Sequence, residues 1–182
     1  MNIQRLSPPQ ASAYRALMLE AYAAHPDAFT SSVAERAALP LSWWEARLAN
    51  GPAPREVVLG ATEGASLLGV AGLSFEIREK ARHKATLFGM YVPASLRGRG
   101  VGRKLVANAL DCARARPGVR VVQLTVTSGN VAAESLYERC GFVTFGLEPL
   151  AVAVAVAVDG GFVSKRHMWC DLRATDESTR RT

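Results

Sequence analysis

Two long segments of the chain carry apolar residues every three to four positions, and this spacing predicts amphipathic helices. The first runs from Pro9 to Ala24, with apolar residues at positions 13, 17, 21 and 24. The second opens at Gly100, keeps an apolar face on each turn and is stopped by Pro117-Gly118. These are the two longest helices that the pattern predicts.

Two shorter helices are predicted from their capping residues. Ser42 can cap a helix over Trp43–Ala49, and Gly141 can end a helix over Asn130–Cys140 in the left-handed conformation. Residues 25–42 contain two prolines and show no sustained hydrophobic period. We expect that segment to be a loose connection.

The remaining apolar segments are short and either dense or alternating, which is typical of strands. Glu63-Gly64-Ala65 separates two of them and predicts a hairpin. A helix joins the strands at 84–92 and 119–127, so the right-handed crossover rule predicts that these two strands are parallel. The predicted strands cover residues 2–5, 55–62, 66–77, 84–92, 119–127, 142–147 and 162–172.

A low-complexity run of alternating alanine and valine occupies residues 151–158, and Asp159-Gly160-Gly161 follows it. The run can pair as a strand with the segment after this turn, which predicts a hairpin. Residues 173–182 are polar, and we expect them to form a disordered tail. Residues 1–172 are then expected to fold as one domain, a size that needs no disulfide or metal for stability.

Composition excludes several classes of protein. The net charge is +6, but basic and aromatic residues do not interleave, so we expect no nucleic-acid binding. The three cysteines are widely spaced, which favours a reducing compartment and no metal site. No segment has the roughly 18 apolar residues of a membrane span, and the amino terminus lacks a signal-peptide pattern. We therefore expect a cytoplasmic protein that does not bind membranes.

The segment Arg97-Gly98-Arg99-Gly100-Val101-Gly102 joins a predicted strand to a predicted helix. Such a turn directs several backbone N–H groups and the positive end of the helix dipole at one point, which favours an anion such as phosphate. A dinucleotide fingerprint would need glycine at position 103, where the chain has arginine. A P-loop would need Gly-Lys-Ser/Thr, where the chain reads Gly102-Arg103-Lys104.

The remaining pattern, Arg-x-x-Gly-x-Gly, resembles the acetyl-coenzyme A pyrophosphate loop of the GNAT N-acetyltransferases. A second motif supports the resemblance: Asn130 is followed by Leu136-Tyr137-Glu138 and then Gly141-Phe142. The resemblance covers residues 86–142 and implies a single α/β (α+β) domain. Its mixed, mostly antiparallel sheet would be flanked by helices and splayed between two central parallel strands.

The resemblance also implies how acetyl-coenzyme A is bound. Backbone groups of the strand would pair with the pantetheine arm, the glycine loop would hold the pyrophosphate, and Asn130 would position the pantetheine amides. Tyr137 would donate a proton to the leaving sulfur as general acid. The predicted cofactor-binding residues are Met90, Tyr91, Val92, Arg97, Gly98, Arg99, Gly100, Val101, Gly102, Arg103, Asn130 and Tyr137. Packing for Tyr137 and helix capping for Asn130 remain alternatives.

The general base is not evident from the sequence. Several members of the family carry a glutamate where this chain has Thr86, eleven residues before Arg97. Thr86 does not accept a proton at neutral pH, so the base candidates are Glu76, Glu79, Glu35 and His83.

The resemblance implies an acceptor pocket lined by the first helices and their connection. Phe29, Trp43 and Trp44 can form an apolar wall, and Asp27 or Glu35 could attract a cationic amine. We expect transfer of acetyl from acetyl-coenzyme A to a primary amine of a small molecule or peptide, by direct attack in a ternary complex. The alternative is a non-catalytic acyl-coenzyme A binding or sensing module. A monomer and a homodimer are both compatible with the sequence.

Overall fold

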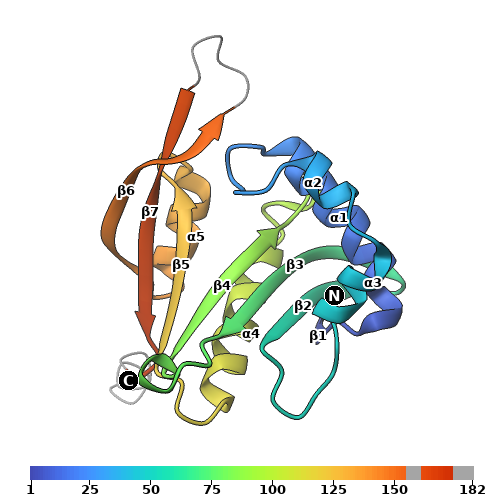
Figure 1. Ribbon diagram of the computed structural model, residues 1–182, viewed down its shortest axis with the longest axis horizontal. Helices are drawn as coiled ribbons and strands as arrows, with labels where there is room; N and C mark the ends of the chain where they lie inside the picture. Colours follow the sequence, from blue (N-terminus) through green and yellow to red (C-terminus); the bar gives the residue numbers. More distant parts are fainter. Residues whose placement is uncertain (155–160, 174–182) are drawn as a thin grey trace.

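The computed structural model describes residues 1–154 and 161–173 (Figure 1). Its strands are β1 (Asn2–Arg5), β2 (Glu56–Glu63), β3 (Ser66–Phe75), β4 (Lys84–Tyr91), β5 (Val121–Thr127), β6 (Val143–Val154) and β7 (Gly161–Asp171). Its α-helices are α1 (Ala11–Ala24), α2 (Val33–Ala37), α3 (Leu41–Arg47), α4 (Val101–Ala115) and α5 (Val131–Arg139). Short 3-10 turns occupy Pro8–Gln10, Glu79–Ala81 and Ala94–Leu96.

The strands form one mixed sheet in the order β1-β2-β3-β4-β5-β7-β6. All neighbouring pairs are antiparallel except β4 and β5, which are parallel. That parallel pairing extends over Lys84, Ala85 and Thr86 of β4, after which the two strands separate (Figure 1). The predicted splay between the two central parallel strands is confirmed.

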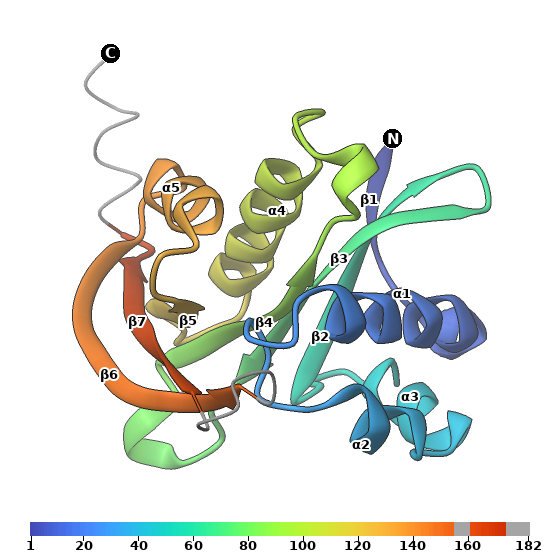
Figure 2. The same cartoon turned by 90° about the horizontal axis from the view of Figure 1, so that it is seen from above.

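Helices cover both faces of the sheet (Figure 2). On one face α4 and α5 pack through residues such as Leu105, Val106 and Tyr137. On the other face α1 and α3 bury Met18 and Trp44 against the sheet. Strands β2 and β3 contribute side chains to both cores, which explains why their apolar runs are nearly continuous.

A bulge in β4 reverses the direction of its side chains near the splay. The register with β3 changes between the pairs Gly72–Phe88 and Val70–Tyr91, so two residues of β4 lie opposite one of β3. Gly89 has a φ of 56°, a left-handed value that glycine adopts at little cost. As a result, Met90 packs against the α4 core, whereas Tyr91 belongs to the α1 core.

Three details differ from the sequence-based predictions. The segment expected to be a loose connection contains α2, whose first turn is fixed by a capping box between Ser32 and Glu35. The prediction that Ser42 caps the next helix is wrong, because α3 begins at Leu41 after Pro40 as N-cap. Strand β6 is continuous across the two separately predicted segments.

Some predictions fall on residues that the structure does not describe. The end of the alanine-valine run and the start of its turn, residues 155–160, lie outside the described residues, as does most of the predicted tail, residues 174–182. Within the described residues, no helix is both long and apolar enough to cross a membrane.

Candidate active site

The glycine loop enters α4 through two residues in left-handed conformations. Gly98 has a φ of 78° and Gly100 a φ of 76°, and a Cβ built on either glycine would meet no atom within 4 Å. Glycine is therefore required here by backbone conformation rather than by crowding. Gly100 is the N-cap of α4 and has no side-chain capping bond, so the first N–H groups of the helix stay available to an anion.

Gly102 has a different role, because its surroundings are crowded. A Cβ at this position would lie 3.0 Å from Met90 Cε and 3.2 Å from Leu136 Cδ2. The missing side chain thus lets the first turn of α4 pack closely against β4 and α5. This packing requirement adds to the predicted role of Gly102 beside the pyrophosphate.

A cavity of about 790 Å³, here called the donor cavity, lies where the glycine loop, the end of β4 and the start of α5 meet. Every predicted cofactor-binding residue lines it except Arg99, which instead forms an ion pair with Glu63 at 3.8 Å. The structure thus brings together two motifs that are about 30 residues apart in the chain.

The donor cavity is rich in positive charge. Arg97, Arg103 and Arg139 line it, against a single carboxylate lining residue, Asp27. The Arg97 guanidinium donates to the Val92 carbonyl at 3.2 Å and lies 2.8 Å from His25 Nε2. Such an arrangement suits a ligand with several negative charges, such as the phosphates of a coenzyme.

Tyr137 is buried in the wall of the donor cavity, with 8% of its surface exposed. Its hydroxyl lies 3.5 Å from Met90 Sδ at the end of β4, and its ring packs edge-on against Phe142. Burial raises the pKa of Tyr137 to about 12, so the phenol keeps its proton at neutral pH. This protonation state is the one that a general acid needs.

Asn130 caps α5, because its side-chain oxygen accepts a hydrogen bond from the Ala133 N–H at 3.2 Å. The capping alternative is therefore confirmed. The pantetheine contact stays a prediction. It is compatible with the cap because Asn130 lines the donor cavity and, within the described residues, its amide NH₂ group donates no hydrogen bond.

The loop from His25 to Phe29 closes one side of the donor cavity. Its backbone is tied to the far side of the splayed strands: the Thr127 hydroxyl donates to the Asp27 carbonyl at 2.9 Å, and Lys165 Nζ donates to the Ala28 carbonyl at 3.2 Å. The sequence-based predictions selected Asp27 and Phe29 from this loop. They did not place His25 at the cavity, and they missed the two anchors. No local signal marks Thr127 or Lys165, which lie in strands far from the loop in sequence.

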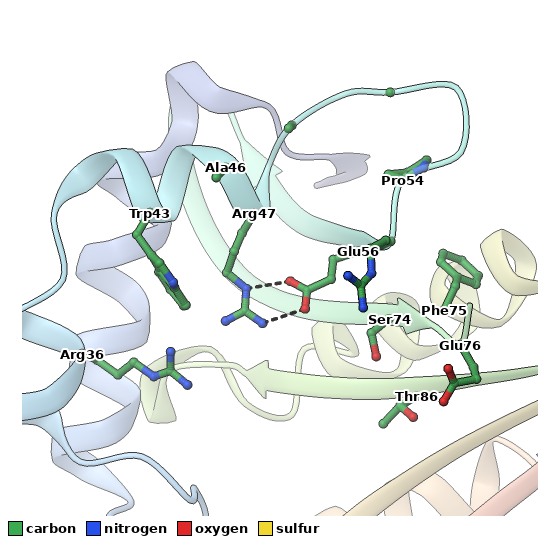
Figure 3. A pocket seen from close by; sticks show the side chains of 13 residues that line it. Arg36, Trp43, Ala46, Arg47, Pro54, Glu56, Ser74, Phe75, Glu76 and Thr86 are labelled. Carbon is green, nitrogen blue, oxygen red and sulfur yellow. Dashed lines mark hydrogen bonds and ion pairs between the residues drawn. The ribbon is translucent and has the colours of Figure 1, made fainter. Parts of the chain in front are cut away.

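A second cavity of about 900 Å³ lies beneath α2 and α3 (Figure 3). Its floor includes Glu56, Ser74 and Thr86, which are cross-strand neighbours on β2, β3 and β4. The residues next to them in each strand, such as Leu73 and Leu87, point to the α4 core. The second cavity is therefore on the opposite face of the sheet from α4.

The predicted acceptor wall is divided between these features. Phe29 lines the donor cavity and Trp43 lines the second cavity. Trp44 is 1% exposed and lines neither, because it packs in the α1 core against Tyr14.

Of the predicted bases, the structure brings Glu76 alone to a cavity. Glu76 lines the second cavity close to Thr86 (Figure 3). Its carboxylate bonds to the Arg78 side chain and accepts from the N–H groups of Ile77 and Arg78 at 2.9 and 3.1 Å. These contacts, led by the Arg78 side chain, lower the pKa of Glu76 to about 2, which makes it a weak proton acceptor.

The other predicted bases lie elsewhere. Glu35 is exposed and accepts a hydrogen bond from the Ser32 N–H at 2.8 Å, which lowers its pKa. Glu79 is exposed in a 3-10 turn. The carbonyl of His83 accepts hydrogen bonds from the N–H groups of Arg120 and Val121, at the start of β5. Neither cavity is lined by any of these three.

The surroundings of Cys140 do not favour cysteine chemistry. Burial raises the pKa of the Cys140 thiol, which disfavours the thiolate form that a covalent mechanism would use. Within the described residues, no group of three or more His, Cys, Asp and Glu side chains is arranged to hold a metal ion.

Residues 14–142 match the acetyltransferase (GNAT) family, and the chain belongs to that family. Among named relatives, the N-alpha-acetyltransferase RimI of Mycobacterium tuberculosis is 35% identical over 94 residues. That match covers 52% of this chain and 56% of the relative, so the chain spans about half of that relative's length.

Solved structures share the fold. An acetyltransferase of the GNAT family from Streptococcus pneumoniae gives a TM-score of 0.81 at 23% identity, over 92% of this chain and 97% of that one. YncA, a putative acetyltransferase from Salmonella typhimurium solved with its cofactor acetyl-CoA, gives 0.75 at 24% identity, over 94% of each chain. The predicted fold class is confirmed.

Proposed function

We propose that this protein transfers an acetyl group from acetyl-coenzyme A to a primary amine, by direct attack in a ternary complex. The observation that carries the proposal is the donor cavity. It gathers the free N–H groups at the start of α4, three arginines and a buried, protonated tyrosine in one place beside the opening between β4 and β5.

The reaction follows from these groups. The neutral amine nitrogen attacks the acetyl carbonyl carbon and forms the new N–C bond, and a backbone N–H near Met90 stabilises the oxyanion. When the C–S bond breaks, the sulfur takes the electron pair and the Tyr137 hydroxyl donates a proton to it. The amine loses one proton to water, and the phenolate recovers one from solvent, so the enzyme returns to its starting state.

A general base is not required when the acceptor amine binds in its neutral form. Glu76 has too low a pKa to remove a proton efficiently at neutral pH, and Thr86 does not ionise there. We therefore propose that water in the opening accepts the proton. The rate should then rise with pH as the fraction of neutral amine increases.

Release of free thiol from acetyl-coenzyme A in the presence of a panel of amines tests the proposal. The panel should contain peptides with free amino termini, because the Mycobacterium tuberculosis relative is an N-alpha-acetyltransferase. It should also contain amino acids and polyamines. We expect amine-dependent thiol release and an acetylated product of 42 Da added mass, about the mass of one acetyl group replacing one hydrogen.

The second candidate is a non-catalytic acyl-coenzyme A binding module. The threonine at position 86 and the ion-paired state of Glu76 favour it, since neither side chain can serve as an efficient base. Tight binding of acetyl-coenzyme A without turnover on the whole panel would support this candidate and contradict the enzymatic proposal.

A further inference from the structure

Most charges around the second cavity are already neutralised by partners. Arg47 forms two hydrogen bonds with the Glu56 carboxylate, at 2.8 and 3.3 Å, and Glu76 is paired with Arg78. Arg36 and Arg55 also line the cavity, and within the described residues neither forms an ion pair. Arg55 is exposed, whereas Arg36 is partly buried. One terminal nitrogen of Arg36 donates to Ser31 Oγ at 2.8 Å, and its buried Nε–H has no hydrogen-bond partner. An arginine with a buried, unsatisfied N–H is costly unless an acceptor is supplied.

Aromatic side chains hold the two arginines in place. Trp43 lies between them, with the Arg36 guanidinium 4.9 Å and the Arg47 guanidinium 4.8 Å from its ring centre. Arg47 also lies 4.8 Å from the Phe88 ring. Stacking on an aromatic face orients a guanidinium and leaves its edge N–H groups for an oxygen ligand. Both arginine side chains point into the cavity in Figure 3.

The opposite end of the second cavity lies close to the opening between the central strands. Thr86 lines that end, and it is also the last residue of β4 that pairs with β5 before the strands separate. Arg36 and Thr86 thus mark two ends of one space (Figure 3). A volume of about 900 Å³ is in the range of small-molecule sites and can hold an amino acid or a short peptide.

We propose that the second cavity binds the acceptor and that Arg36 recognises a carboxylate on it. The amine would then lie toward Thr86 and the strand opening, with its carboxylate against the guanidinium end. The acceptors are accordingly amines that also carry a carboxylate, such as amino acids or the free ends of short peptides, and polyamines are excluded by charge. This inference rests on the proposed acetylation of amines and names its substrate class.

The charge of the second cavity favours a different ligand from the cationic amine that Asp27 or Glu35 was expected to attract. Glu35 does not line either cavity, and Asp27 lines the donor cavity instead. Two side chains at the second cavity, Arg36 and Arg55, have no ionic partner within the described residues, and both are cations. A carboxylate there would accept charge-assisted hydrogen bonds from the Arg36 guanidinium.

Matched acceptor pairs test the inference. Phenylalanine is compared with phenylalaninamide, and alanyl-alanine with alanyl-alaninamide. Each KM is expressed as the concentration of the neutral amine, so that differences in amine pKa do not affect the comparison. Cadaverine serves as the polyamine. We expect the carboxylate member of at least one pair to have a KM lower by about tenfold or more, the scale of one hydrogen bond between charged groups.

The Arg36→Gln variant should remove that preference. Its KM for the carboxylate acceptor should rise to that of the amide, while its KM for acetyl-coenzyme A and for the amide acceptor stays unchanged. Arg36→Lys should restore part of the preference, because it keeps the charge but not the planar fork. The control is Arg15→Gln: Arg15 also holds α2, through the Ala37 carbonyl at 2.9 Å, but lines neither cavity. It should keep the full preference.

The outcomes separate this inference from the proposed function. Acetylation of carboxylates and amides with equal KM, or an equal loss on both in Arg36→Gln, would overturn the inference and leave the acetyltransferase proposal intact. Absence of acetylation on the entire panel would count against the proposed function. Calorimetric titration of the same pairs in the presence of coenzyme A then decides the inference without turnover: a carboxylate preference lost in Arg36→Gln supports it, and equal or absent binding overturns it.

Discussion

The two cavities lie on different sides of the splayed strands and are built in different ways. The donor cavity is shaped by backbone conformation at a left-handed glycine loop, the start of α4 and the end of β4, and three arginines add positive charge to it. The second cavity is made of side chains, with arginine and tryptophan from α2 and α3 above a floor of polar residues from three strands. A site shaped by backbone conformation suits a ligand that stays the same. In a site lined by side chains, single substitutions can alter which ligand is bound.

The difference also appears in how each cavity is held. The donor loop depends on conformations that glycine adopts freely, so few other residues can occupy its positions. At the second cavity, Arg36, Trp43 and Arg47 are fixed by stacking and by one carboxylate, and none of the three has a left-handed backbone conformation. We infer that the donor cavity determines which acetyl donor is bound and that the second cavity determines which acceptor is bound.

The largest expected effect is that of Tyr137→Phe on the chemical step. Without the phenol, the thiolate leaves unprotonated, and kcat should fall by about 10²- to 10⁴-fold. Tyr14→Phe is the matched control, because Tyr14 is also buried and has a pKa raised to about 12 but lies in the other core. Steady-state kinetics checks both. An unchanged kcat in Tyr137→Phe would remove the acid role.

Gly100→Val should impair the donor cavity through backbone conformation. A β-branched residue resists a φ of 76°, so the loop would shift and lose at least two N–H contacts to the pyrophosphate. Affinity for acetyl-coenzyme A, measured by calorimetry, should fall by about 100-fold. Gly118→Val is the control, with a φ of 84° and open space but outside both cavities. Equal affinity in both variants would contradict the phosphate-loop assignment.

Asn130 allows capping to be separated from ligand binding. Asn130→Ala should lower the free energy of unfolding by about 1 kcal/mol, the usual cost of a lost N-cap. Asn130→Asp keeps the capping oxygen and should unfold like the wild type in denaturant titrations. If the amide NH₂ also donates to pantetheine, Asn130→Asp should still raise the KM for acetyl-coenzyme A, by about fivefold. An unchanged KM would leave Asn130 as a cap alone.

The smallest expected effect is a flat alkaline region in the pH profile. Burial raises the pKa of Tyr137 to about 12, so deprotonation removes the acid only as the pH approaches that value. Once the amine is fully neutral, kcat should change by less than about twofold up to pH 10.5, where a phenol of ordinary pKa would already be about three-quarters ionised. A decline centred near pH 10 would show that Tyr137 is not shielded as the structure implies.

The parts of the fold and site that the sequence predicted are those carried by local patterns. Helical spacing indicated α1 and α4, and the helix between two apolar strands indicated the parallel pair. Eleven of the twelve residues predicted to bind the cofactor line the donor cavity, because local backbone geometry determines how the loop is shaped. Arg99 was the exception, since its direction depends on Glu63 in a separate hairpin.

The remaining features depend on contacts between distant segments. The second cavity assembles Arg36, Arg47, Glu56 and Thr86 from four elements, and no spacing in the chain predicts that meeting. The bulge at Gly89 was equally hidden, although a glycine within a strand is a weak signal of one. Ser42 was selected as a cap from residue type alone, whereas Pro40 sets the start of α3 through its extended backbone.

Amide hydrogen exchange with and without saturating acetyl-coenzyme A tests the division between the two cavities most directly. Bound pyrophosphate should accept from the free N–H groups of the glycine loop, so exchange should slow in peptides that cover residues 97–104. Exchange in residues 33–47, which include α2 and α3, should stay unchanged until an acceptor is added. Slowing confined to residues 33–47, with residues 97–104 unaffected, would contradict the assignment of the donor to the glycine loop.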